Sequence, residues 1–559
     1  MKPEELETKA TAERARQAKT TCTLACCGSA GCQLPGTSTT TTDYFKQQVK
    51  AAGVADKVRV VPTGCMGLCS RGPIARISVP GQPDQMFVEL DAAKAASLVD
   101  SVVKPIGQGA APVIAADITN NVLPANEPFF AKQTKLVLKN MERLNAESID
   151  DYILNGGYKA AAKALTTMTR EAVIKELKDS GLRGRGGAGF PTGMKWELTA
   201  KTPSDVKYVI CNADEGDPGA FMDRGVLEGD PHAVLEGMII GAYAMNATNG
   251  VLYIRAEYPL AVERVERAIR AARAAGLLGK DILGSGLNFD CDVRLGAGAF
   301  VCGEETALIA SCEGKRGTPR PRPPYPSVKG MWDKPTCINN VETLANIAHI
   351  INRGAAWFSS IGTEKSKGTK VFALTGKVRN NGLVEVPMGT TIRTIVEDIG
   401  GGTANGKKVK AIQTGGPSGG MIPAQFFDTP VSYEHLQQLG SIMGSGGMIV
   451  LDEDDSVVEL TRFYLEFTVD ESCGKCAPCR IGGKQLLLIL DKIVAGKGTR
   501  KDLATAQRIA KTMQKASLCG LGQTAPNPVL SAMKYFLPEF EARLVDGSAA
   551  KASPVPAAK

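Results

Sequence analysis

The stretch Cys473-Gly-Lys-Cys476-Ala-Pro-Cys479, joined by Cys519 forty residues later, decides how the C-terminal part of this chain is organised. Three cysteines at a spacing of three fall within about two helical turns and can offer three thiolates to one compact cluster. The remote cysteine then supplies the fourth ligand, which is the ligation pattern of a [4Fe–4S] cubane. Zinc and plain buried thiols are the alternatives, but structural zinc sites usually pair two Cys-x-x-Cys hairpins.

Length and composition indicate a globular protein of several domains. At 559 residues, about three to five domains are expected. The net charge of +8 is modest and dispersed, which argues against a nucleic-acid partner. No apolar stretch is long enough to form a transmembrane segment, and residues 1–20 lack the apolar core of a secretory signal. Fifteen cysteines without such a signal predict a reducing compartment, the cytoplasm, and thiols that serve metal binding.

A second set of cysteines lies near the N-terminus. Cys27 and Cys32 form a C-x4-C loop, and Cys65 and Cys69 form a C-x3-C loop after a predicted strand. Two pairs of thiolates on short loops suit a [2Fe–2S] cluster, in which each iron takes one pair. Cys22 or Cys26 could replace a member of the first pair, and a redox-active dithiol or a zinc site is the alternative to a cluster. The other cysteines are interpreted as small buried apolar residues: Cys22, Cys26, Cys211, Cys291, Cys302, Cys312 and Cys337.

The run from Gly181 to Trp196 is the strongest candidate for a phosphate-binding loop. Its glycines leave the backbone nearly bare, so its N–H groups can surround a phosphate beside Arg183, Arg185 and Lys195. It contains G-x-G-x-x-G, but it follows a predicted helix, whereas the dinucleotide fingerprint lies between a strand and a helix. A mobile surface loop is the alternative.

Acidic and amide side chains follow two predicted structural elements. Asn212, Asp214, Glu215 and Asp217 come just after a strand, where open α/β sheets bind ligands. The run Gly303-Glu304-Glu305 enters a helix, and its glutamates would stabilise that helix N-terminus whatever the function. Clustered carboxylates need donors, and a flavin edge or a ribose provides them. Asn339 and Asn340 add neutral groups, whereas Arg264, Arg267, Arg270 and Arg273 are interpreted as a solvated basic face.

The pattern of elements predicts a multidomain protein of mixed α/β and α+β class. Strands and helices alternate between residues 207 and 355, short strands with Gly-rich turns occupy 370–460, and helices dominate afterwards. The expected boundaries are an N-terminal domain at 22–103, a linker at 104–128, an α/β domain at 129–355, a β-rich domain at 356–461, a helical bundle at 462–545 and a disordered tail at 546–559.

Together these motifs resemble the NADH-oxidising flavoprotein subunit of respiratory complex I. The resemblance rests on residues 181–196, 212–224, 296–308, 335–344 and the Cys473 to Cys519 quartet, in order and at family-like spacing. Residues 22–103 are similar to a thioredoxin-like [2Fe–2S] domain. With this domain in front, and with the runs 214–223 and 320–326, the chain is most similar to the diaphorase subunits of NAD-reducing bidirectional [NiFe]-hydrogenases.

The resemblance implies a Rossmann-like FMN- and NAD(H)-binding domain, a β-grasp-like (SLBB-like) domain and a helical bundle with one [4Fe–4S] cluster. FMN contacts carried over by matching motif positions are Gly184, Arg185, Gly186, Lys195, Asn212, Asp214, Glu215, Gly303, Glu304, Asn339 and Asn340. Dinucleotide contacts are Gly187, Phe190, Asp217, Glu305, Arg322 and Tyr325, and Glu215 and Asp217 are the candidate catalytic residues. Asp217, Arg322 and Tyr325 depart from the complex I pattern (Glu, Lys and Phe) but keep charge or aromatic character.

The implied function is a diaphorase that exchanges hydride between NAD(H) and FMN and passes single electrons through iron–sulfur clusters. Expected partners are a thioredoxin-like [2Fe–2S] subunit, a ferredoxin-like iron–sulfur subunit and a hydrogenase module. The alternative is the flavoprotein of an electron-bifurcating hydrogenase or of an NAD-dependent formate dehydrogenase. NADH is expected to be preferred over NADPH, because Glu305 would accept hydrogen bonds from a ribose 2′-hydroxyl and repel a 2′-phosphate.

Overall fold

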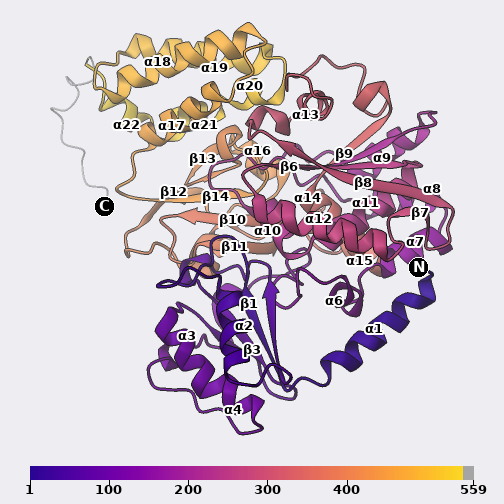
Figure 1. Cartoon of the computed structure of the whole chain (residues 1–559). Coiled ribbons are helices and arrows are strands. Elements are labelled where there is room, and N and C mark those ends of the chain that lie inside the picture. Colours follow the sequence, from indigo (N-terminus) through magenta and orange to yellow (C-terminus); the bar gives the residue numbers. More distant parts are fainter. Residues whose placement is uncertain (546–559) are drawn as a thin grey trace.

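The computed structural model describes residues 1–545. Three sheets organise it: a small N-terminal sheet, a central sheet and a third sheet that carries the C-terminal helices. Figure 1 shows the N-terminal sheet at one end of the molecule and the C-terminal helices at the other. Within residues 1–545, no helix combines the length and apolarity needed to cross a membrane.

Helix α1 (Pro3–Gln17) precedes the first sheet and was not expected from the sequence. Proline opens it, acidic residues occupy its first turn and basic residues its last turn, an arrangement that complements the helix dipole. Leu6 and Ala10 are buried against the central domain, and Gln17 donates a hydrogen bond to Asp151. The helix therefore packs on the body of the protein despite its few apolar residues.

The N-terminal sheet has the strand order β2-β1-β3-β4, with β1 parallel to β2 and antiparallel to β3. Its strands are β1 (Cys22–Cys27), β2 (Val58–Thr63), β3 (Ala75–Ser78) and β4 (Gln85–Phe87), and its helices are α2 (Thr41–Ala51), η1 (Cys69–Arg71), α3 (Ala92–Leu98), η2 (Val99–Val103), α4 (Lys104–Gly107) and η3 (Thr119–Asn121). Residues 104–128 were expected to be a linker. They instead pack on this sheet, since Ile118 is buried and Val122 bridges to Phe87.

The central sheet has the order β7-β8-β6-β5-β9, and its pairings from β8 through β6 and β5 to β9 are parallel. Its strands are β5 (Tyr208–Ala213), β6 (Asn249–Arg255), β7 (Gly279–Ile282), β8 (Leu287–Gly296) and β9 (Thr336–Asn340). The surrounding helices are α5 (Pro128–Ala131), α6 (Ile149–Leu154), α7 (Lys159–Thr167), α8 (Arg170–Ser180), α9 (Thr192–Lys201), α10 (Met222–Gly229), α11 (Pro231–Met245), α12 (Pro259–Ala274), η4 (Phe300–Gly303), α13 (Glu305–Cys312), η5 (Met331–Asp333), α14 (Val341–Arg353) and α15 (Ala355–Ser359).

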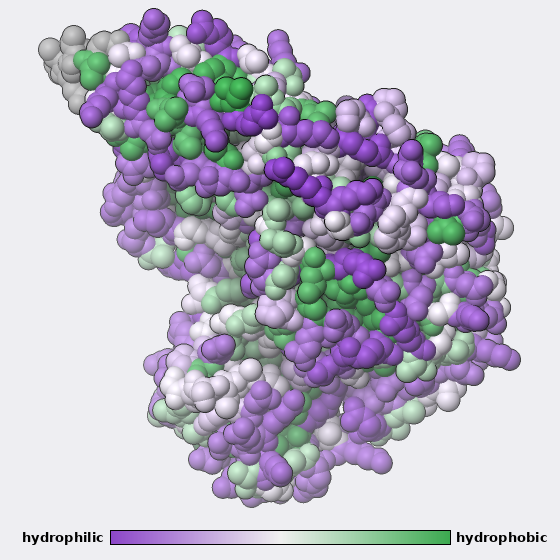
Figure 2. All heavy atoms as spheres, turned by 45° about the horizontal axis from the view of Figure 1, so that its top comes forward, coloured by the Kyte–Doolittle hydropathy of each residue, from purple (hydrophilic) through white to green (hydrophobic). Residues whose placement is uncertain are grey.

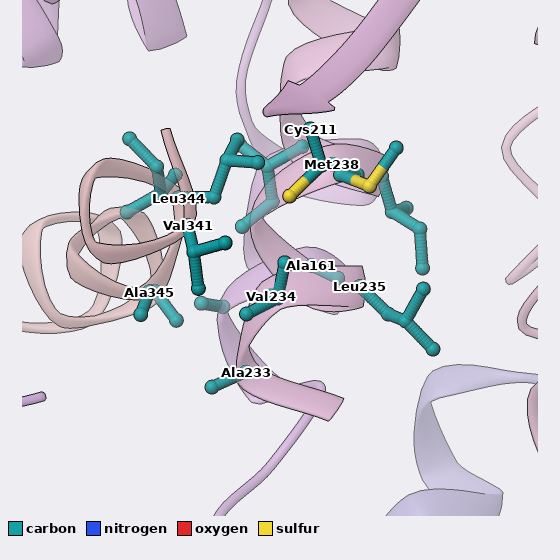
Figure 3. Close-up of a cluster of buried hydrophobic side chains, with 14 of the residues drawn as sticks. Ala161, Cys211, Ala233, Val234, Leu235, Met238, Val341, Leu344 and Ala345 are labelled. Atoms are coloured by element: carbon teal, nitrogen blue, oxygen red, sulfur yellow. The ribbon is translucent and has the colours of Figure 1, made fainter. Parts of the chain in front are cut away.

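Helix α11 forms the centre of the largest hydrophobic core. Nearly all of its residues are buried, as expected for a helix that is apolar on every side. Figure 3 shows Val234 and Met238 of this helix facing Val341 and Leu344 of α14 and Cys211 of β5. This packing fixes β5 and β9, the two strands whose ends carry the polar motifs.

The third sheet has the mixed order β11-β10-β14-β12-β13. Its elements are β10 (Thr369–Gly376), β11 (Gly382–Pro387), η6 (Thr394–Ile399), β12 (Val409–Thr414), η7 (Gly416–Ser418), β13 (Gly420–Pro423), η8 (Ala424–Phe426), α16 (Tyr433–Gln438) and β14 (Gly447–Asp452). Only β10 and β14 run parallel; the other pairings are antiparallel. Short strands with Gly-rich turns were expected here, and the structure has them.

The C-terminal helices pack around a core that includes Leu486 and Leu490. They are α17 (Val457–Asp470), η9 (Pro478–Gly482), α18 (Gly483–Val494), α19 (Arg500–Ala516), α20 (Gly520–Thr524), α21 (Asn527–Tyr535) and α22 (Leu537–Glu541). Figure 2 shows apolar side chains gathered over these helices, where Phe463, Ile481 and Leu488 are exposed. The expected tail, residues 546–559, lies outside the described residues.

Candidate functional site

A pocket of about 440 Å³ lies at the carboxyl ends of β5 and β9, within the size range of small-molecule cofactor sites. The predicted residues that line it are Gly186, Gly187, Asn212, Asp214, Glu215, Asp217, Gly303, Glu304 and Asn340. We call it the flavin pocket below, for the cofactor that the sequence predicted. Parallel strands end at one edge of a sheet, and this explains how motifs more than a hundred residues apart come together.

The Gly-rich loop between α8 and α9 forms one wall of the flavin pocket. The N–H of Gly184 donates to the carbonyl of Phe190 at 2.9 Å, which closes the loop on itself. Gly187 has φ +120°, a conformation that side chains rarely adopt, and its backbone bridges to Gly444 of the third domain. The hydroxyl of Tyr433 donates to the carbonyl of Gly184 at 2.7 Å. The loop is thus held from both sides and is not a mobile surface loop.

The arginines of this loop do not behave as the sequence suggested. The guanidinium of Arg185 is buried and donates to the carbonyls of Arg183, Lys367 and Thr369, so it is not directed at the flavin pocket. Arg183 lines the pocket and stacks on the ring of Tyr433 with 4.1 Å between guanidinium carbon and ring centre. The side chain of Arg185 therefore supports the loop, and Arg183 is the cation of this loop that borders the pocket.

Buried carboxylates dominate the opposite wall. Both carboxylate oxygens of Asp214 lack a hydrogen-bond partner, and burial raises the pKa of this residue to about 7. Glu215 accepts the N–H groups of Asp223 and Arg224 at 3.0 and 3.1 Å, yet burial raises its pKa to about 7 as well. Burial raises the pKa of Asp217 to about 6, and the hydroxyl of Ser445 donates to it at 2.7 Å.

These features fit a bound FMN. An unpartnered buried carboxylate is costly, and Asp214 requires donors of the kind that a flavin ring or a ribityl chain offers. Gly186, Gly187 and Gly303 leave bare backbone around the same space. Asn212 and Asn340 are fixed in orientation, since Asn212 donates to the carbonyl of Gly303 at 3.0 Å and Asn340 donates to Asp223 at 2.5 Å.

The remaining predicted cofactor residues lie outside the lining of the flavin pocket. Glu305 accepts a hydrogen bond from Arg322 at 2.6 Å and lies 3.7 Å from the ammonium of Lys195, whereas Phe190 and Tyr325 are 44% and 56% exposed. These residues form an exposed group suited to a dinucleotide that approaches from solvent.

Asn339 and Gly184 have structural positions instead. The side chain of Asn339 is buried and accepts a hydrogen bond from the indole N–H of Trp196 at 2.9 Å. Gly184 lies within the Gly-rich loop, where both its N–H and its carbonyl are engaged by other residues of the protein. Both residues therefore shape the surroundings of the pocket and do not line it.

The two glutamates at the start of α13 differ in role. Glu304 accepts the N–H groups of Thr306 and Ala307 at 2.9 and 3.0 Å, so it caps the helix as the sequence allowed. It also lines the flavin pocket. Glu305, the next residue, instead pairs with the two cations Lys195 and Arg322.

The four C-terminal cysteines lie together in a second, smaller pocket. Cys473, Cys476, Cys479 and Cys519 line it with Val301, Pro319, Ser472, Lys475, Leu518 and Leu521. The backbone N–H of Leu518 donates to the sulfur of Cys476 at 3.5 Å. Within residues 1–545, no three His, Cys, Asp or Glu side chains converge as the ligands of a single metal ion would. The thiols ring a cavity, which fits a cluster.

The N-terminal thiols also gather at one place. The sulfurs of Cys65 and Cys69 are 3.6 Å apart, and hydrogen bonds from Cys32 and Cys65 lower the pKa of Cys27. Backbone N–H groups reach this site too, since Gly67 donates to the sulfur of Cys65 at 3.4 Å. Cys22 and Cys26 lie in a different core, so the structure favours the pair Cys27 and Cys32. All seven remaining cysteines are buried, as predicted.

A polar pocket at strand ends beside a ring of thiols defines a flavin- and iron–sulfur-dependent oxidoreductase subunit. Residues 177–349 match the Nuo51 FMN-binding domain, residues 371–422 the SLBB domain and residues 459–543 the NADH-ubiquinone oxidoreductase-F iron-sulfur binding region. The chain belongs to the family of FMN-binding flavoprotein subunits of NADH oxidoreductases. The resemblance, the enzyme class, FMN and the C-terminal iron–sulfur region predicted from the sequence are thereby confirmed.

Relatives from two settings resemble the chain. The HndC subunit of the NADP-reducing hydrogenase of Solidesulfovibrio fructosivorans is 58% identical over 74% of this chain and 84% of its own length. The NuoF-type relative from Escherichia coli, a component of NADH-quinone oxidoreductase, is 43% identical over 70% of this chain and 89% of its own length. Among solved structures, an NAD+-reducing [NiFe]-hydrogenase in the H2-reduced state aligns with 99% of this chain and 94% of its own at 29% identity, with a TM-score of 0.65.

Sequence reasoning missed the part of the flavin pocket that the third domain and the C-terminal helices supply. These residues are Gly415, Ser418, Tyr433, Gln437, Ile442, Met443, Gly444, Ser445, Gly520, Leu521 and Thr524. The Gly-rich runs 415–420 and 444–447 were a visible signal, because bare backbone suits close approach to a ligand. Nothing in the sequence indicated that these runs face the pocket.

Proposed function

We propose that this chain is the diaphorase subunit of a hydrogenase that exchanges electrons with NAD(H). FMN would occupy the flavin pocket, and a [4Fe–4S] cluster would be held by Cys473, Cys476, Cys479 and Cys519. Bound FMN accepts two electrons together as hydride and releases them singly, which is the chemistry that connects a nicotinamide to an iron–sulfur cluster. The relatives in hydrogenases support this assignment over a complex I setting, because one of them aligns with almost the whole chain.

One observation carries the proposal: the flavin pocket and the thiol pocket share a wall. Val301 and Leu521 line both pockets, so a single layer of side chains separates the two sites. Phe300, which also lines the flavin pocket, packs edge-on against Phe467 of α17 with ring centres 5.5 Å apart, and its N–H donates to Glu471 at 2.7 Å. These contacts fasten the C-terminal helices to the flavin pocket and support direct electron exit through the C-terminal thiols.

The chain's own groups have separate tasks in this scheme. Asp214 would receive hydrogen bonds from FMN, and Gly186 and Gly187 would let the cofactor approach the backbone. We assign Glu215 and Asp217 as the catalytic candidates, since their raised pKa values of about 7 and 6 place their charge under the control of the local environment. Glu305 with Arg322 would contact the ribose of the dinucleotide and favour NADH.

The N-terminal domain is proposed to be thioredoxin-like and to hold a [2Fe–2S] cluster on Cys27, Cys32, Cys65 and Cys69. Its mixed sheet and the gathered thiols support this assignment. The partners proposed are a thioredoxin-like [2Fe–2S] subunit, a ferredoxin-like iron–sulfur subunit and a hydrogenase module, in the cytoplasm. The exposed apolar residues Ile481 and Leu488, next to the C-terminal thiols in the sequence, support a partner contact there.

Anaerobic purification of the chain tests the proposal. The protein should carry FMN and iron, should reduce an artificial electron acceptor with NADH, and should co-purify with hydrogenase subunits when isolated from its host. Full iron content without FMN binding and without dye reduction would overturn the diaphorase assignment. Co-purification with formate dehydrogenase subunits would leave the flavin chemistry intact and replace only the partner.

A further inference from the structure

One arginine of the basic stripe on α12 is buried at the junction between the N-terminal domain and the central domain. Arg264 is 4% exposed, and one of its terminal nitrogens donates to the carbonyls of Thr63 and Glu228. A Cβ atom on Gly28 would lie 2.9 Å from the other terminal nitrogen. Gly28 follows Cys27, and Thr63 stands two residues before Cys65, so one guanidinium touches both cysteine loops.

Its neighbours on the same helix behave differently. Arg267, Arg270 and Arg273 are 39% to 64% exposed at the side chain and pair with carboxylates on the surface. The expected solvated basic face is therefore wrong for Arg264 alone. Burial lowers the pKa of Arg264, and the nearby negative groups Glu147, Glu228 and Cys27 oppose that effect. The electrostatic neighbours of this guanidinium thus include one of the candidate cluster ligands.

A buried carboxylate lies on the other side of the same loop. Glu228 is 1% exposed, accepts a hydrogen bond from the hydroxyl of Ser29 at 2.7 Å and lies 3.5 Å from Arg224. Ser29 stands between Cys27 and Cys32. The contact between the domains is also tight, because a Cβ atom on Gly64 would come 2.5 Å from the Cα of Gly229. The cysteine loops are therefore seated on α10 and α12 by opposite charges and by backbone contact.

Helix α10 connects this junction to the flavin pocket. Its last turn holds Glu228, and at its first turn the N–H groups of Asp223 and Arg224 donate to Glu215. An eight-residue helix spans roughly 12 Å at 1.5 Å per residue. The geometry of the N-terminal thiols relative to the flavin pocket is thus set by one short helix and the side chains at its ends.

We propose that Arg264 is a positioning residue that docks the N-terminal thiol site on the central domain and raises the reduction potential of the cluster bound there, with Glu228 acting in the opposite direction. This inference rests on the proposed [2Fe–2S] cluster. Reduction adds one negative charge to the cluster, and a buried cation nearby stabilises that charge more than it would in water. A buried carboxylate nearby destabilises it by the same reasoning.

Redox titration of the full-length chain, followed by electron paramagnetic resonance, tests the proposal. Arg264→Gln should make the [2Fe–2S] signal about tenfold harder to reduce at a fixed ambient potential, which for a one-electron couple is a shift of about 59 mV to more negative values. Glu228→Gln should shift the midpoint to more positive values. Arg270→Gln, on the same helix but exposed, is the matched control and should change nothing. The [4Fe–4S] midpoint should not move in any of the three.

The outcomes separate the inference from the function on which it rests. An unchanged midpoint in Arg264→Gln, with cluster content intact, overturns the role of Arg264. If that variant loses the cluster, Arg264→Lys decides: retention of the cluster near the wild-type midpoint supports the charge, and loss of the cluster or an equal negative shift overturns it. Absence of any [2Fe–2S] signal from the iron-loaded wild-type chain overturns the N-terminal cluster itself, and this inference with it.

Discussion

Asp214→Asn should stabilise the FMN-free protein and weaken its affinity for FMN. Asp214 is buried, neither of its carboxylate oxygens has a partner, and burial moves its pKa from an ordinary 3.8 to about 7. At 1.36 kcal/mol per pKa unit, this displacement corresponds to about 4 kcal/mol against folding once the group is ionised in both states. Asparagine imitates the neutral acid in shape, so the substitution removes the cost of the charge and little else.

The sign of the pH dependence follows from the raised pKa. Below about pH 4 the carboxyl is protonated in the folded and the unfolded chain, and it contributes no such cost. As the pH rises from about 4 to about 7 the unfolded chain releases the proton first, so the stability of the wild type falls relative to the variant. Above about pH 7 the difference is constant. Allowing for half of the full figure, we expect Asp214→Asn to be about 2 kcal/mol more stable at pH 8.

Denaturant unfolding of FMN-free protein at pH 5.5 and pH 8 measures this difference, and FMN titration measures the affinity. Loss of a hydrogen bond to a charged group costs about 1.5–3 kcal/mol, so FMN should bind at least tenfold more weakly to Asp214→Asn. Asp100→Asn, at an exposed position, is the control for both assays. A variant that is less stable than the wild type at pH 8, or that binds FMN equally well, would refute the reasoning.

Three further changes probe the other parts of the site. Cys476→Ser should abolish the [4Fe–4S] signal and leave the N-terminal signal in place; zinc in place of iron in the wild type would contradict this. Tyr433→Phe removes a hydrogen bond to Gly184 and should weaken FMN binding by about threefold to tenfold without loss of iron, which fluorescence titration measures. Glu305→Ala removes a carboxylate and frees its two cationic partners, so the ratio of NADPH to NADH activity should rise about tenfold; equal use of both by the wild type would count against the assignment.

The sequence predicted the parts of the site that are local in the chain. The spacing from Cys473 to Cys479 places three thiols on one turn and the start of a helix, and the structure gathers them with Cys519. The polar residues after Tyr208–Ala213 had to lie at the carboxyl edge of a parallel sheet, and they line the flavin pocket. In both cases the covalent chain itself limits where the side chains can go.

The features that the sequence did not predict depend on contacts between distant segments. The direction of the Arg185 side chain is decided by carbonyls of Lys367 and Thr369, almost two hundred residues away. Periodicity placed Arg264 in an exposed row because a helical repeat describes one helix and carries no information about a domain that covers it. Helix α1 has a low apolar content and is held by a surface that belongs to another domain.

The composite construction of the flavin pocket has a consequence for cofactor retention. Its walls come from the central domain, from the loop around Gly444 in the third domain and from Leu521 in the C-terminal helices. FMN therefore contacts surfaces that are brought together only when these domains are docked, so binding of the cofactor and docking of the domains stabilise each other. Because Leu521 also lines the thiol pocket, the same docking aligns the route for electrons. A chain that holds FMN is thereby a chain in which the path from the flavin pocket to the C-terminal thiols is assembled.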